Sequence, residues 1–116
     1  MENELIDLIE TILPAFTVKF AAGRTLEEFI ATDAGRKTIF VNFDGIDGYN
    51  QFEDQSYDGI TENYRVFILD MHNIQDTART LFNALKSNEI GVILGSGMFD
   101  NTFSQAVYVQ NLAINY

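Results

Sequence analysis

The chain has 116 residues, of which 47% are apolar, and it carries seven Lys and Arg against 17 Asp and Glu. The apolar share is too high for a disordered acidic chain, so we expect residues 1–116 to form a single folded domain. The absence of cysteine excludes disulfides, thiolate metal sites and cysteine nucleophiles, and the net charge of −10 disfavours direct binding to nucleic acid, because phosphates would be repelled.

The N-terminal third of the chain predicts a helix, a strand and a second helix. Residues 2–13 place Leu and Ile at helical spacing with acids between them, and Pro14 ends the run. Residues 16–20 alternate as a short strand, and residues 25–28 form a capping-box pattern that opens a helix toward Gly35. Because the first residues are acidic and no apolar run approaches the roughly 18 residues of a membrane span, we expect neither a signal peptide nor a membrane segment.

The middle of the chain predicts two strands and the most regular helix. Residues 38–43 and 63–71 are rich in β-branched and aromatic residues and predict strands, the second of them buried on both faces. Residues 73–86 carry an apolar stripe at helical spacing, and Asn73 stands where an N-cap is expected. Two long strands in succession favour hairpin pairing over a parallel crossover.

The C-terminal part predicts two further strands, at residues 91–95 and 103–116, joined around residues 96–102. The last strand is apolar on both faces, with Ala106, Tyr108, Leu112, Ile114 and Tyr116 on one and Val107, Val109 and Ala113 on the other. This strand is either buried within the monomer or presents an apolar face or an unpaired edge to another subunit. The element order predicts a two-layer α+β fold, a mixed or antiparallel sheet of about four to five strands with helices packed on one face.

An acidic segment, residues 44–62, separates two of the predicted strands and contains no basic residue. It has two interpretations: a long polar hairpin whose Gly, Asn and Asp residues satisfy turn geometry, or a loop that presents its acids to a partner or a channel. The overall charge is likewise open to three explanations, which are solubility alone, attraction to a basic partner, or repulsion of nearby DNA. The candidate partner-facing or lumen-facing residues are Asp44, Asp47, Glu53, Asp54, Asp58 and Glu62.

Signals for metal binding and catalysis are incomplete in this sequence. Residues 54–60 match the opening of a calcium loop, but position twelve would be Arg65 and the flanks predict strands instead of helices. His72 is the only histidine, and no serine lies in a G-x-S-x-G elbow. Residues 95–97 resemble a phosphate-binding turn, yet Asp100 stands at the third glycine position and no Walker lysine follows. We therefore predict a protein that is not an enzyme, with no catalytic, cofactor or metal site.

Four features carry a family resemblance: the first helix ending at Leu13 and Pro14, the strand at residues 39–43, the 64–71 strand that runs directly into the 73–86 helix, and the terminal 108–116 strand. In size, composition and element order, over most of its length, the chain resembles the tail-terminator proteins of tailed bacteriophages, the Mu-like or lambda-like tail-completion or minor tail proteins. The resemblance implies a structural protein of a phage or prophage virion, assembled in the bacterial host cytoplasm and without catalytic residues.

The same resemblance implies partners. It implies a homo-oligomeric ring, usually a hexamer, that sits on the end of the tail tube, stops tube polymerisation and docks the head-completion proteins of the connector. The acidic segment would then face either the lumen, where negative charge keeps passing DNA from adhering, or the tube protein below. Two other hypotheses remain, an acidic inhibitor or immunity-type protein that covers a basic partner, and a small-ligand or calcium-binding domain.

Overall fold

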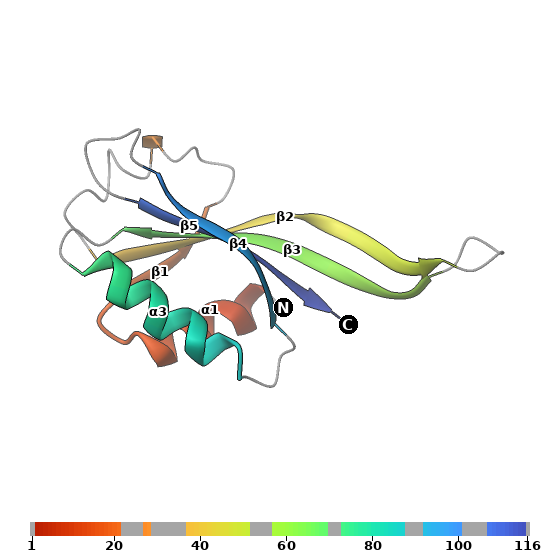
Figure 1. The fold of residues 1–116 in the computed structure, drawn as a ribbon, viewed down its shortest axis with the longest axis horizontal. Coiled ribbons are helices and arrows are strands. Elements are labelled where there is room, and N and C mark those ends of the chain that lie inside the picture. Colours follow the sequence, from red (N-terminus) through yellow and green to blue (C-terminus); the bar gives the residue numbers. More distant parts are fainter. Residues whose placement is uncertain are drawn as a thin grey trace.

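The computed structural model describes residues 2–21, 27–28, 37–51, 57–69, 73–87, 92–100 and 107–115. Within these residues it contains two α-helices, each longer than two turns, and a five-stranded sheet, and both helices lie on the same side of that sheet (Figure 1). The predicted α+β fold is therefore confirmed. The elements, in chain order, are α1 (Glu2–Ile12), β1 (Thr17–Phe20), β2 (Thr38–Gln51), β3 (Tyr57–Leu69), α3 (Ile74–Leu85), β4 (Val92–Asp100) and β5 (Val107–Asn115).

The strands lie in the order β1-β2-β3-β5-β4, with β1 parallel to β2 and every other neighbouring pair antiparallel. The last strand, β5, is therefore paired on both sides, and the prediction that it could offer an unpaired edge is wrong. Its apolar residues on both faces suit an interior position between two strands. The edges of the described sheet are β1 and β4.

The main core lies between the helices and the sheet. Helix α1 contributes the apolar side of its amphipathic pattern, and α3 packs Leu81 and Leu85, both completely buried, against the same sheet face. Strand β5 alternates as predicted, with Leu112 and Ile114 in this core. A second, smaller buried cluster contains residues of β2, β3 and β5 that alternate with those of the main core: Phe40, Phe67, Leu69 and Val107, with Ala21 beside them.

The two central strands are much longer than predicted and form an arm. Residues 44–51 and 57–62 continue β2 and β3, and their pairing extends out to Gln51 opposite Tyr57. Residues 44–51 and 57–62 are thus paired strands of a long hairpin, as the first interpretation expected, and not a connection between two shorter strands. Residues 52–56 lie outside the described part, and contact of these acids with a partner stays a prediction. The arm projects past the ends of both helices (Figure 1). The radius of gyration is accordingly 15.1 Å, whereas a compact chain of this length has about 13 Å.

Strand β4 also exceeds its prediction, since it continues through residues 96–100, which were expected to belong to the connection. The ladder with β5 shifts its register between Leu94 and Gly97. The buried Gln110 side chain fills this bulge: its Nε2 donates to the carbonyl oxygen of Gly95 at 2.8 Å, and its Oε1 accepts from the Tyr108 hydroxyl at 3.0 Å. A backbone carbonyl that the bulge leaves without a strand partner is thus satisfied by a side chain.

The start of α3 and the helix predicted from residue 25 can each be compared with the structure. Helix α3 begins after Asn73 as predicted, but the Asn73 side chain makes no capping hydrogen bond; its carbonyl oxygen accepts from the Thr77 N–H at 2.9 Å. Of the helix predicted from residue 25 toward Gly35, only residues 27 and 28 are described, and they are helical. The remainder of that prediction lies outside the described residues.

Candidate interaction surfaces

The six candidate acids do not share one face of the arm. Asp44 and Asp47 lie on the face away from the helices, whereas Glu62 lies on the helix side, because it alternates with Asn63 and Thr61 along β3. Glu53 and Asp54 lie outside the described residues, and the side chain of Asp58 does so too. The described acids therefore form two separate surfaces instead of one cluster.

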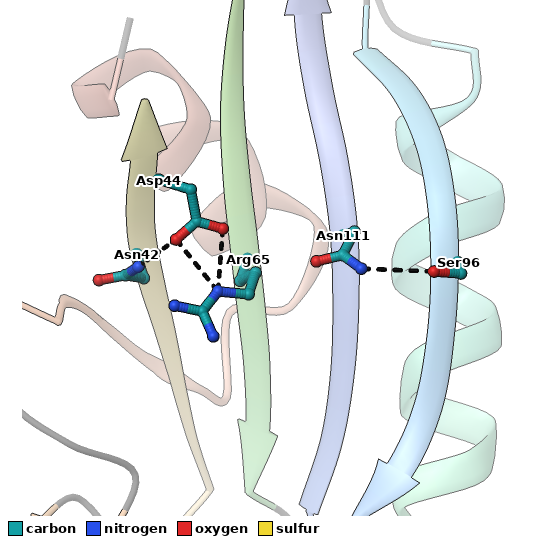
Figure 2. A network of polar contacts seen from close by, with 5 residues as sticks. All are labelled: Asn42, Asp44, Arg65, Ser96 and Asn111. Atoms are coloured by element: carbon teal, nitrogen blue, oxygen red, sulfur yellow. Dashed lines mark hydrogen bonds and ion pairs between the residues drawn. The ribbon is translucent and has the colours of Figure 1, made fainter. Parts of the chain in front are cut away.

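Asp44 is compensated by a neighbouring base. Its two carboxylate oxygens accept from Arg65 Nε at 3.0 and 2.9 Å, and one of them also accepts from the Asn42 amide (Figure 2). The Arg65 guanidinium lies 5.6 Å from the ring centroid of Phe67, which places it over the edge of the second apolar cluster. On the same face Asn111 donates to Ser96 at 3.3 Å across β5 and β4 (Figure 2). These contacts make a polar surface at the base of the arm, in which the charge of Asp44 is compensated.

The other two described acids have neutral partners. Asp47 accepts from the Asn63 amide at 2.8 Å, and Glu62 accepts from the Tyr64 hydroxyl at 3.2 Å. A neutral donor orients a carboxylate but does not cancel its charge. Asp47 and Glu62 are therefore the described positions of the arm at which negative charge is presented to the surroundings.

The helix-side face of the arm is apolar and exposed. Phe43, Ile46 and Ile60, here called the arm stripe, are 40%, 57% and 40% exposed. The cross-strand register places all three on one face, with Phe43 opposite Tyr64 and Ile46 opposite Glu62. The Phe43 ring meets the buried Tyr64 ring edge-on at 5.5 Å, so the stripe continues the main core outward. This stripe was not predicted from the sequence, because glycines and acids separate its apolar residues and a bulge shifts their spacing between Phe43 and Gly45.

The β4 edge is a second exposed surface. Ile93, Met98 and Phe99 are 50%, 68% and 43% exposed, and β4 pairs with β5 alone among the described strands. The register of β4 on β5 places Ile93 and Met98 on the face away from the helices and Phe99 on the helix side. An edge strand with apolar side chains is suited to contact with another chain.

A groove lies between α3 and the β4 edge, on the helix side of the sheet. It has a volume of about 280 Å³, and its apolar floor contains Ala78, Phe82, Leu94, Phe99 and Tyr108. The Tyr108 ring lies 5.1 Å from Phe99 and 5.8 Å from Phe82, centroid to centroid. Two basic side chains, Arg79 and Lys86, line the groove together with Gln75, Asn83 and Gln110. Sequence reasoning missed this groove, because it forms only when three separate elements, α3, β4 and β5, pack together in the fold.

The residues weighed for metal binding and catalysis are only partly described. Arg65, at position twelve of the incomplete calcium loop, belongs to β3 and pairs with Asp44. His72 and residues 54–56 lie outside the described residues. Within the described ranges no three His, Asp or Glu side chains are grouped to hold a metal ion. In the same ranges no helix is long and apolar enough to cross a membrane.

Comparisons of the chain with known protein families and with curated proteins found no match. The function is therefore inferred from the surfaces of the molecule itself. Those surfaces are the arm stripe, the acids beside it, the β4 edge and the groove along α3.

Proposed function

We propose that this protein is a structural subunit of a phage or prophage tail, a tail terminator or completion protein. It assembles as a homo-oligomeric ring on the end of the tail tube, stops tube polymerisation and docks the head connector. The observation that supports this proposal is the projecting β2–β3 arm with its exposed Phe43, Ile46 and Ile60. Exposed apolar side chains on an extension beyond the core add less to the monomer fold than buried ones and are suited to contacts between subunits.

The placement of the surfaces favours a ring over a closed dimer. The arm extends from β2 and β3, whereas the exposed edge is β4, on the other side of β5. When two different surfaces of one chain meet, the contact is head-to-tail, and repetition of that contact closes a ring or builds a filament. Asp47, with its uncompensated charge, would repel DNA phosphates if its face lined a ring lumen.

The proposal is tested by sedimentation velocity and native mass spectrometry of the purified chain, alone and with polymerising tail-tube protein. We expect a single closed oligomer, and tubes that stop growing and carry the ring at one end in electron micrographs. A chain that stays monomeric and leaves tube length unchanged would overturn the proposal. If such a monomer instead bound a basic protein with a steep salt dependence, the acidic-inhibitor hypothesis would be supported.

A further inference from the structure

The arm stripe combines apolar surface with negative charge. Phe43, Ile46 and Ile60 lie on one face of the arm, and Glu62 lies among them, directly opposite Ile46. The partner of the Glu62 carboxylate is the neutral Tyr64 hydroxyl, at 3.2 Å. A surface that receives this stripe must therefore be apolar in the middle and basic at its margin.

The groove between α3 and β4 has this character. Its floor is made of aliphatic and aromatic side chains, and Arg79 and Lys86 line it. These are two of only seven basic residues in a chain with 17 acids, so a basic margin is exceptional on this molecule. Asp76 reaches Arg79 at 3.9 Å, but these side chains are 80% and 67% exposed, and such a pair contributes only about 0–1 kcal/mol. Arg79 is therefore free to exchange this contact for another carboxylate.

We infer that the arm stripe of one subunit docks into the α3–β4 groove of a second copy of this chain, with Glu62 beside Arg79 and Lys86. The arm continues β2 and β3 away from the body (Figure 1). The groove lies at the β4 edge of the body, so the two surfaces of one chain are separate and can meet different neighbours. The contact is then head-to-tail, and it rests on the proposed ring, for which it supplies the repeating interface.

The absence of cysteine allows a direct test by cross-linking. Ile46→Cys, on the arm, is mixed with a separate preparation of Asn83→Cys, in the groove, and disulfide formation between the two chains is followed under mild oxidation. We expect rapid cross-linking of this pair. Ala15→Cys, at an exposed position after α1, replaces Asn83→Cys as the matched control and should cross-link at least about tenfold more slowly.

Charge reversal tests whether Glu62 lies beside Arg79 and Lys86 in this contact. Arg79→Glu with Lys86→Glu, or Ile46→Asp alone, should raise the dissociation constant of the assembly at least about tenfold. Ala15→Asp is the control, because Ala15 is exposed and belongs neither to the arm stripe nor to the groove nor to the β4 edge; it should change the constant by less than about twofold. Adding Glu62→Lys to the double reversal should restore assembly, since the complementary charges are then exchanged.

The outcomes separate this inference from the proposed function. A ring that forms normally while Ile46→Cys cross-links no faster to Asn83→Cys than to Ala15→Cys would overturn the arm-to-groove contact and leave the ring standing. A chain that neither assembles nor cross-links at any of these positions would overturn both. Thermal unfolding of each variant, which should match that of the unsubstituted chain, shows that a loss of assembly is not a loss of folding.

Discussion

Gly97 lies directly against the side chains of Gln110 and Tyr108, at the point where the β4–β5 ladder shifts its register. A methyl group on Gly97 would overlap both Gln110 Oε1 and Tyr108 Oη. These two atoms share a hydrogen bond of 3.0 Å, and Gln110 Nε2 also satisfies the carbonyl of Gly95. The bulge, the glycine and the buried amide therefore form one interdependent unit beside the groove.

Gly97→Ala should destabilise the protein by about 1–3 kcal/mol, because the added methyl group displaces a hydrogen-bonded side chain and a ring in a packed region. Urea unfolding followed by circular dichroism measures the change. Ser96→Ala is the matched control: Ser96 is exposed and only its hydroxyl contact with Asn111 is lost, so the cost should be under about 0.5 kcal/mol. Equal losses for the two variants would contradict this account of the bulge.

Gln110→Ala should change the free energy by which Gly97→Ala destabilises the protein. Truncation of Gln110 leaves the Gly95 carbonyl and the Tyr108 hydroxyl without this partner, which should cost about 1–3 kcal/mol by itself. It also clears part of the space that a methyl group at residue 97 needs. A double-mutant cycle should therefore give a coupling free energy of about 0.5–3 kcal/mol, with the double variant more stable than the sum of the single changes predicts. Strict additivity would show that the two sites act separately.

Gly45→Ala should destabilise the arm for a different reason. Gly45 has a φ of 145°, a region that residues with a side chain rarely adopt, at the bulge between Phe43 and Gly45. Nothing lies within 4 Å of an added Cβ, so the expected cost of about 1–3 kcal/mol comes from the backbone and not from crowding. Hydrogen exchange should show faster opening of the arm amides at residues 44–51 and 57–62, while core amides such as Ile68 keep their protection. Unchanged exchange along the arm would count against this explanation.

The helices and the centres of the strands could be predicted from the sequence, since their signals are local. In α3 the repeat of Ala78, Leu81, Phe82 and Leu85 defines one buried side, and α1 has a similar apolar repeat. The alternation of Val107, Val109, Leu112 and Ile114 gave the two faces of β5 correctly. These patterns depend only on neighbours in the chain.

The arm and the groove could not be predicted in the same way. Gly45, Gly48 and the acids around them are poor strand formers, and these residues are extended because β2 and β3 bond to each other residue by residue. The groove needs Phe82, Phe99 and Tyr108 from α3, β4 and β5, which the sheet order brings together. The sheet order depends on the pairing of β5 between β3 and β4, a long-range choice with no signal in any one segment.

Asp44→Asn should lower stability only slightly. The Asp44 and Arg65 side chains are 29% and 45% exposed, and an ion pair of this kind is worth about 0–1 kcal/mol at low salt. In about 1 M NaCl, where the screening length falls to about 3 Å, the difference from the unsubstituted chain should shrink toward zero. Thermal unfolding at low and high salt measures both values, with Asp47→Asn as a control that removes the charge of a carboxylate whose partner is a neutral amide. A loss above about 2 kcal/mol that persists in high salt would show that Asp44 has a structural role beyond this ion pair.

Replacing isoleucine with threonine at two positions of β2 should show that the arm and the core contribute differently to the stability of the monomer. Ile39 is completely buried in the main core, whereas Ile46, on the same side of the same strand, is 57% exposed in the arm stripe. Ile39→Thr should cost about 2–4 kcal/mol, because it removes buried apolar surface and places a hydroxyl among apolar side chains. Ile46→Thr should change the free energy of unfolding of the monomer by less than about 0.5 kcal/mol, measured in urea at low protein concentration. If Ile46→Thr were as costly as Ile39→Thr under these conditions, the arm stripe would belong to the monomer core and would not be available to a second subunit.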